Sequence, residues 1–181
     1  MVELLLLSIP TIAYIVFMTT KRSLPRSQAL KNTGITSGTP ISYLWAVAIL
    51  LGICALTWVL SFFIDSHLLD QPGVVVGHAT SIIAVVGVIF RAFGEEIFFR
   101  GFLGGLLVRR FGFTLGNFFQ AVIFFLPHLM LLAVSVQVWP LLILQFISGW
   151  LLGWLRHVSG SVLPAGLVHS ATNLLAPLFL A

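Results

Sequence analysis

Charged residues are scarce in this chain. Only 8% of its 181 residues are Asp, Glu, Lys or Arg, whereas 59% are hydrophobic. A soluble domain carries roughly 25% charged residues, so this chain has too few to cover a surface in contact with water. A helix needs about 20 apolar residues to span the hydrocarbon core of a bilayer. The sequence therefore predicts an all-α, polytopic transmembrane bundle, with residues 1–181 forming a single integral-membrane domain.

Cysteine and acidic residues are also nearly absent. The single cysteine, Cys54, lies in an apolar run and has no second cysteine for an intrachain disulfide. Nine basic residues against five acidic ones leave a net charge of +4. The basic residues form short clusters between apolar runs, as in cytoplasmic loops, rather than a face for phosphate binding. We therefore expect no nucleic-acid partner, and a lipid bilayer around the chain instead.

Six apolar runs divide the chain: residues 4–19, 41–64, 80–110, 113–136, 141–155 and 162–180. Basic clusters mark the ends of the first, third and fifth runs. Lys21, Arg22, Arg26 and Lys31 follow the first run, Arg109 and Arg110 end the third, and Arg156 follows the fifth. Six crossings place all of these clusters on one side, which the positive-inside rule assigns to the cytoplasm. The pattern predicts about six spans in the cell membrane, with the N-terminus and the acidic loop at residues 65–73 outside. Residues 21–40, rich in Ser, Thr, Gly and Pro, are predicted to be a connector.

Four ionisable residues interrupt the third run, at Arg91, Glu95, Glu96 and Arg100. Ionisable groups at membrane depth cost several kcal/mol and usually mark function. On a helix, Glu96 and Arg100 share a face, as do Arg91 and Glu95. One consistent arrangement has Arg100 neutralising Glu96, while Glu95 faces the bundle interior as the working carboxylate. The alternative is an ion-pair lattice that only locks two helices together.

Two later runs also carry polar groups at depth. His128 follows Pro127 in the fourth run, where a proline frees a backbone carbonyl and bends the helix. His169 and Asn173 share one face of the last run. At 1.5 Å per residue, Glu95 and His128 each lie about 21–22 Å from the cytoplasmic ends of their runs, and His169 and Asn173 about 12–18 Å. The groups can thus converge at one level, and a carboxylate, two imidazoles and an amide form a hydrolytic set.

Three ordered motifs carry a family resemblance: Glu-Glu-x-x-x-Arg at 95–100, Phe-x-x-x-His at 124–128 and His-x-x-x-Asn at 169–173. The sequence around the motifs matches as well. The first motif runs into Phe-Arg-Gly-Phe-Leu, and the last motif is preceded by Gly-Trp-Leu-Arg-His-Val-Ser-Gly-Ser-Val. Over residues 84–175, the expected protease core, the chain resembles the CPBP family of intramembrane proteases. This family, also called the CAAX-protease and bacteriocin-processing (Abi) family, includes the type II CAAX prenyl endopeptidases.

The resemblance implies that a peptide bond is hydrolysed within the membrane. It implies that Glu95 and His128 activate a water molecule, while His169 and Asn173 stabilise the oxyanion. Glu96 and Arg100 would orient these groups and balance charge, and Arg91 and Phe124 would support them. No cofactor is favoured, because an asparagine suits an oxyanion donor better than a metal ligand.

Alternatives to this mechanism and function stay open. Two histidines and a carboxylate also match a catalytic zinc pattern, in which Glu95, His128 and His169 would be the ligands. Substrates would be membrane-anchored or hydrophobic-tailed, such as a bacteriocin precursor or a protein with a C-terminal sorting tail. A proton-coupled transporter is a second hypothesis, although the paired repeats common in transporters do not occur. A non-catalytic immunity protein of the same fold is a third.

Overall fold

The computed structural model describes residues 2–64, 79 and 81–180, and no strand occurs among them. The all-α prediction is thus confirmed, while the acidic loop predicted at residues 65–73 lies outside the described residues. The elements in chain order are α1 (Val2–Thr20), α2 (Arg26–Thr33), α3 (Pro40–Ser61), α4 (Ile82–Glu96), the π-helix η2 (Ile97–Leu103), α5 (Gly104–Phe125), the 3₁₀-helices η3 (Leu126–Ala133) and η4 (Val136–Val138), α6 (Trp139–Ser159) and α7 (Leu163–Leu180).

Four helices in the described part of the chain are long and apolar enough to cross a bilayer: Val2–Thr20, Pro40–Ser61, Val136–Ser159 and Leu163–Leu180. Arg91, Glu95, Glu96 and Arg100, which we call the charged cluster, lie outside these four helices, on α4 and η2. The chain then reverses at Gly112, whose φ of 76° interrupts α5. Only glycine adopts such a φ readily. Gly112 lies between the predicted third and fourth runs. The count of six spans remains a prediction.

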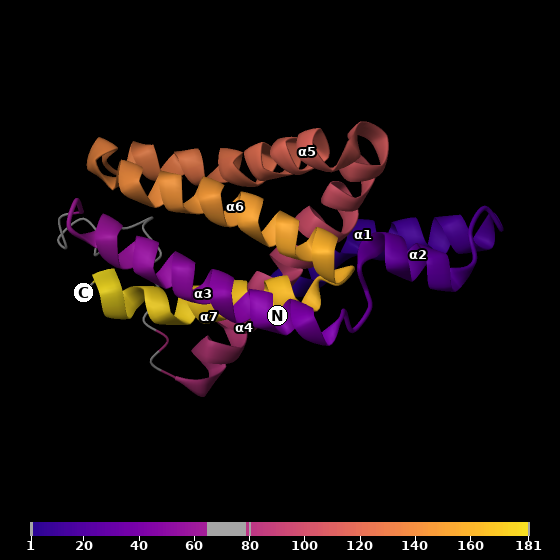
Figure 1. The fold of residues 1–181 in the computed structure, drawn as a ribbon, viewed down its shortest axis with the longest axis horizontal. Helices are drawn as coiled ribbons and strands as arrows, with labels where there is room; N and C mark the ends of the chain where they lie inside the picture. The colour runs from indigo at the N-terminus through magenta and orange to yellow at the C-terminus, as the bar shows by residue number, and fades with distance from the viewer. Residues whose placement is uncertain (1, 65–78, 80, 181) are drawn as a thin grey trace.

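The helices pack as two pairs, with α5 antiparallel to α6 and α3 parallel to α7, and α4 lies beside them (Figure 1). α5 packs along α6, α3 packs along α7, and α4 lies between α7 and α1 (Figure 1). The buried apolar cluster that joins α3, α6 and α7 consists of Ala46, Ile53, Leu144, Leu152, Leu155, Ala165 and Val168. On the opposite face of α3, Leu44, Leu51 and Trp58 recur every seven residues and are exposed. An exposed apolar face on a core-forming helix is typical of contact with lipid.

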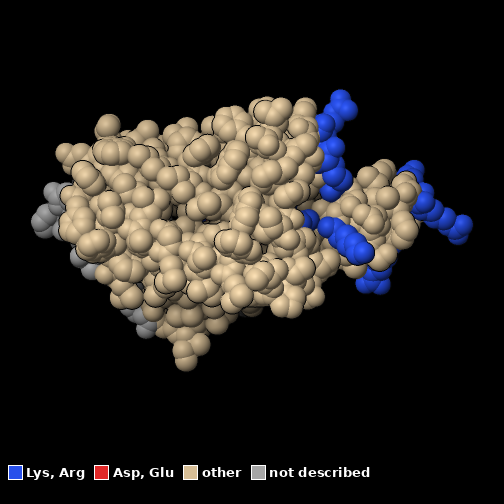
Figure 2. Space-filling model, in the orientation of Figure 1, with Lys and Arg blue, Asp and Glu red and all other residues tan. Residues whose placement is uncertain are grey.

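The basic residues outside the charged cluster gather at one end of the molecule, which we call the basic end. Its residues are Lys21, Arg22, Arg26, Lys31, Arg109, Arg110 and Arg156. Figure 2 shows Lys and Arg side chains concentrated there, beyond the ends of the long helices. Hydrogen bonds join its parts: the Arg109 Nη1 donates to the Asn32 carbonyl at 3.1 Å, and the Arg156 Nη2 donates to the Lys31 carbonyl at 3.2 Å. The shared end agrees with the positive-inside pattern.

The segment predicted to be a plain connector contains a helix, so that prediction was wrong. α2 begins after Pro25 and ends at Gly34, which has a left-handed φ of 71°. Proline at a helix start and glycine just past its end are helix boundary signals. α2 also packs closely on η2. The approach is so close that a Cβ at Gly101 would lie 2.7 Å from the Thr33 carbonyl oxygen. Tertiary contacts therefore stabilise an eight-residue helix that would be marginal alone.

Candidate active site

A fully buried ion pair forms the inner wall of the site. Glu96 ends α4 and Arg100 lies one turn later in η2, and the Arg100 Nη1 is 2.9 Å from the Glu96 Oε1. The two atoms are close enough for an ion pair, although they are not aligned as a hydrogen bond. The Arg100 guanidinium also lies 4.0 Å from the centroid of the Phe124 ring. A carboxylate on one side and an aromatic face on the other thus stabilise its charge.

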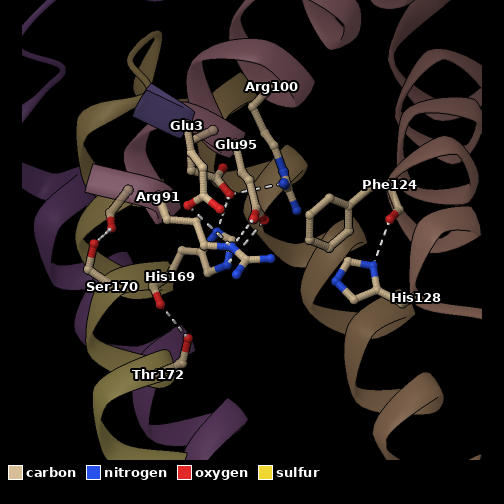
Figure 3. Close-up of polar contacts among 11 residues, drawn as sticks. Glu3, Arg91, Glu95, Arg100, Phe124, His128, His169, Ser170 and Thr172 are labelled. Atoms are coloured by element: carbon tan, nitrogen blue, oxygen red, sulfur yellow. Dashed lines mark hydrogen bonds and ion pairs between the residues drawn. The ribbon is translucent and has the colours of Figure 1, made fainter. Parts of the chain in front are cut away.

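His169 of α7 contacts both neighbouring carboxylates. Its Nδ1 is 2.8 Å from the Glu96 Oε1, and its Nε2 is 3.8 Å from the Glu95 Oε2 (Figure 3). Because an ionised carboxylate only accepts hydrogen bonds, Nδ1 must be the donor to Glu96. This contact holds the imidazole with Nε2 directed toward Glu95. The same Glu96 oxygen therefore receives both Arg100 and His169.

Glu95 lies in a more open environment than Glu96. Its side chain is 17% exposed, and its Oε1 accepts a hydrogen bond of 3.2 Å from the Arg91 Nε. Arg91 is half exposed and also approaches Glu3, with 3.9 Å between the Arg91 Nε and the Glu3 Oε2. Two adjacent carboxylates thus occupy different surroundings, one dry and the other close to solvent. Glu3, at the start of α1, was not among the residues that the sequence pointed to for this site.

His128 is oriented by the backbone next to Pro127. The helix tightens to 3₁₀ geometry at Leu126, where the Phe124 carbonyl would pair with the N–H of residue 127. Proline has no N–H, and the His128 Nδ1 lies 2.9 Å from this carbonyl oxygen instead. Because a carbonyl only accepts, Nδ1 carries the proton, and Nε2 of the neutral ring is free to accept one.

One cavity brings the candidate residues together. It has a volume of about 580 Å³, and Glu95, His128, His169 and Asn173 all line it. Glu96 and Arg100 lie behind its wall. Toward the end of α7 and the start of α6, the lining becomes apolar: Met130, Leu131, Val134, Leu141, Leu144, Ala176 and Leu180. The cavity can therefore take an apolar segment at one end and polar chemistry at the other.

The π-helix carries Arg100 and was not predicted from the sequence, which indicated one continuous helix. Such insertions are frequent at functional sites and leave carbonyls without their usual intrahelical donors. Here the Thr11 hydroxyl of α1 donates to the Ile97 carbonyl at 3.1 Å, at the start of η2. Figure 3 shows the Phe124 ring between Arg100 and His128, and its centroid lies 4.9 Å from that of His128. The distorted helix and the aromatic ring thus separate the buried cation from the imidazole.

The zinc alternative can be tested against this arrangement. No three His, Cys, Asp or Glu side chains are grouped to hold a metal ion within the described residues. Glu95 and His169 approach each other, but His128 lies across the cavity with its Nδ1 toward a carbonyl (Figure 3). Three ligands at about 2.0–2.2 Å from one ion would require these side chains to move together. As arranged, the three side chains are not grouped as a zinc site, and the mechanism below includes no metal step.

Acid–base side chains around a cavity in an apolar helical bundle are typical of membrane-embedded hydrolases. A family model described as type II CAAX prenyl endopeptidase Rce1-like matches residues 77–175, more than half of the chain. The chain therefore belongs to this CAAX-protease (CPBP) family, a family of intramembrane proteases. Comparison with curated proteins gives no match, and comparison with solved structures gives none either. The chain is accordingly a membrane protein of a protease family.

Proposed function

We propose that this chain is a multi-pass endopeptidase of the cell membrane that hydrolyses a peptide bond in a membrane-anchored or hydrophobic-tailed substrate. The observation that carries the proposal is the single cavity that Glu95, His128, His169 and Asn173 share. Its apolar end suits a substrate segment drawn from the bilayer, such as a C-terminal sorting tail or the hydrophobic part of a peptide precursor. Its polar end contains a base and donors for an oxyanion.

Water activation falls to Glu95 and His128. Glu95 is the more exposed of the two carboxylates, and an ionised carboxylate can accept a proton from water. The His128 Nε2 has its lone pair free because Nδ1 donates to the backbone. These two groups line the same cavity, and a water molecule between them would attack the scissile carbonyl carbon. The proton that Glu95 takes from this water then passes to the leaving amine.

The oxyanion is stabilised by His169 and Asn173. The Asn173 amide donates without titrating. His169 already donates through Nδ1 to Glu96, so it needs a second proton on Nε2 to donate to the oxyanion. The contact of Nδ1 with Glu96 at 2.8 Å holds the ring so that Nε2 faces Glu95 at 3.8 Å. Glu96 therefore acts by orienting His169, and Arg100 offsets the carboxylate charge in the wall.

The test compares protein cleavage in cells that express the wild type or a variant, with new protein N-termini identified by chemical labelling and mass spectrometry. Glu95→Gln, His128→Ala and His169→Ala should each abolish wild-type-dependent N-termini in membrane proteins. Loss of a general base usually costs about 10²–10⁴-fold in rate. His157→Ala is the matched histidine control, since His157 stacks on Phe113 at 4.3 Å and lines a separate cavity. An unchanged set of N-termini with Glu95→Gln would refute the proposal.

A further inference from the structure

A second cavity opens on the other side of Arg100, at the basic end. Its volume is about 200 Å³, and it lies between α2, the junction of η2 with α5, and α6. Arg100 and Gln120 form its buried floor, since each residue is only 1% exposed. Lys31, Arg109 and Arg156 surround them. Arg100 thus lies between the two cavities. It pairs with Glu96 in the wall of the first cavity and lines the second cavity.

The charges around this second cavity have one sign. Four cationic side chains, Lys31, Arg100, Arg109 and Arg156, line it, and no Asp or Glu does so in the part of the chain that the structure describes. Glu96 offsets Arg100 from the first cavity's side. The other three cations converge on the same hollow without a carboxylate in its lining. A concave site with cations of one sign attracts an anion, and its low-dielectric walls strengthen the attraction.

The floor also carries hydrogen-bond donors without acceptors among the described residues. They are the Arg100 Nε and Nη2 and the Gln120 Nε2, and the Arg156 Nε beside the floor also lacks an acceptor, whereas the Arg100 Nη1 is paired with Glu96. A buried donor without an acceptor costs about 1–3 kcal/mol, and more when it is charged, so such groups usually have a partner. All four of these atoms donate, and a group with several acceptor oxygens can satisfy donors from several directions.

We propose that this cavity binds a phosphate group. A guanidinium fork matches phosphate oxygens in geometry and charge, and phosphate offers enough acceptors for Arg100, Gln120 and Arg156 together. Two sources share this chemistry: the headgroup of an anionic phospholipid and free phosphate. The position at the basic end is where the positive-inside rule expects the cytoplasmic leaflet, and basic pockets between membrane helices there bind anionic headgroups. This proposal stands on the second cavity alone and does not depend on the proteolytic function.

The test measures binding to the purified full-length protein in neutral detergent. One arm titrates inorganic phosphate against sodium chloride at equal ionic strength and follows thermal unfolding, since a ligand that binds only the folded state raises its stability. The other arm adds phosphatidylglycerol or phosphatidylcholine and counts the retained lipids by native mass spectrometry. Saturable phosphate binding alone identifies free phosphate as the ligand. Selective retention of phosphatidylglycerol identifies the headgroup.

Variants connect the binding to this cavity. Gln120→Leu removes one buried donor at similar volume and should weaken binding about ten-fold, the usual effect of one hydrogen bond to a charged group. Lys31→Met removes an exposed cation at the rim and should weaken it about three-fold. Lys21→Met is the charge-matched control, since Lys21 belongs to the basic end but does not line the cavity, and it should leave the affinity within two-fold. If neither ligand binds saturably, or if Gln120→Leu binds as wild type does, the proposal is wrong.

Discussion

Glu96→Gln tests whether the buried carboxylate stabilises the bundle and only indirectly serves the chemistry. One Glu96 oxygen receives both contacts, from Arg100 at 2.9 Å and from His169 at 2.8 Å. A glutamine can keep its carbonyl oxygen in that position. Its amide nitrogen then replaces the Glu96 Oε2, which has no hydrogen-bond partner among the described residues. The substitution therefore preserves both contacts in geometry and removes their charge.

The loss of charge should be costly because Arg100 stays buried. Both side chains of the pair have no exposed surface, and removal of one partner of such a pair typically costs about 3–5 kcal/mol. Glu95 offers the contrast, since it pairs with an Arg91 side chain that is half exposed. Exposed ion pairs contribute about 0–1 kcal/mol. Substitution of the two adjacent glutamates should thus differ by about 2 kcal/mol or more in its effect on stability.

The assay is the free energy of unfolding in mixed micelles, measured by titration with a denaturing detergent and far-UV circular dichroism. Glu96→Gln should lower it by about 3–5 kcal/mol, and Glu95→Gln by less than about 1 kcal/mol. The double variant Glu96→Gln with Arg100→Met removes both charges and should regain most of the loss, because replacement of a whole buried pair is often neutral. Equal stability of the two single glutamine variants would refute the assignment of dry and wet carboxylates.

Three further outcomes follow from the same structure. Pro127→Ala restores a backbone N–H that competes for the carbonyl bound by His128, so kcat should fall about ten-fold while KM stays unchanged, measured on any substrate found by N-terminal labelling. Gly94→Ala should destabilise the bundle in the same unfolding assay, because the added Cβ would lie 2.9 Å from the Leu4 Cα. Gly87→Ala is the control on the same helix: its Cβ meets no atom within 4 Å, so the variant should be more stable by up to about 1 kcal/mol. A zinc chelator should leave cleavage unchanged, and activity lost to the chelator and restored by zinc would overturn the metal-free mechanism.

The sequence was sufficient for the fold class and the family, because both depend on signals carried along the chain. Apolar content predicts the solvent, and the spacing of Lys and Arg clusters predicts which ends share a side. The connector at residues 21–40 shows the limit. α2 has a helix start signal at Pro25 and a helix stop signal at Gly34, yet its polar composition suggested a loop. Packing against η2 and hydrogen bonds from Arg109 and Arg156 stabilise the helix. These tertiary contacts cannot be read from the sequence.

For the site, spacing predicts which side chains share a helix face, but it does not predict how two helices are rotated against each other. The i, i+4 relation of Glu96 and Arg100 follows from the sequence, whereas the contact between Glu96 and His169 depends on how α4 faces α7. The π-helix is equally hidden, because it arises where the Thr11 hydroxyl can take up a carbonyl at its start. Glu3 was missed for a related reason: nothing in its local pattern indicates that α1 meets α4 beside Arg91.

The two adjacent glutamates show how one short motif can supply both a buried wall residue and the proposed base. Successive residues on a helix project about 100° apart, so a Glu-Glu pair at the edge of a cavity directs one carboxylate into the wall and the other into the cavity. Glu96 goes to the wall, where Arg100 compensates its charge. Glu95 lines the cavity and is partly exposed. Because His169 contacts the Glu96 oxygen and approaches a Glu95 oxygen, the buried wall fixes the direction of the ring that faces the proposed base. Moving either carboxylate by one residue would therefore break the link between the buried charge and the proposed chemistry.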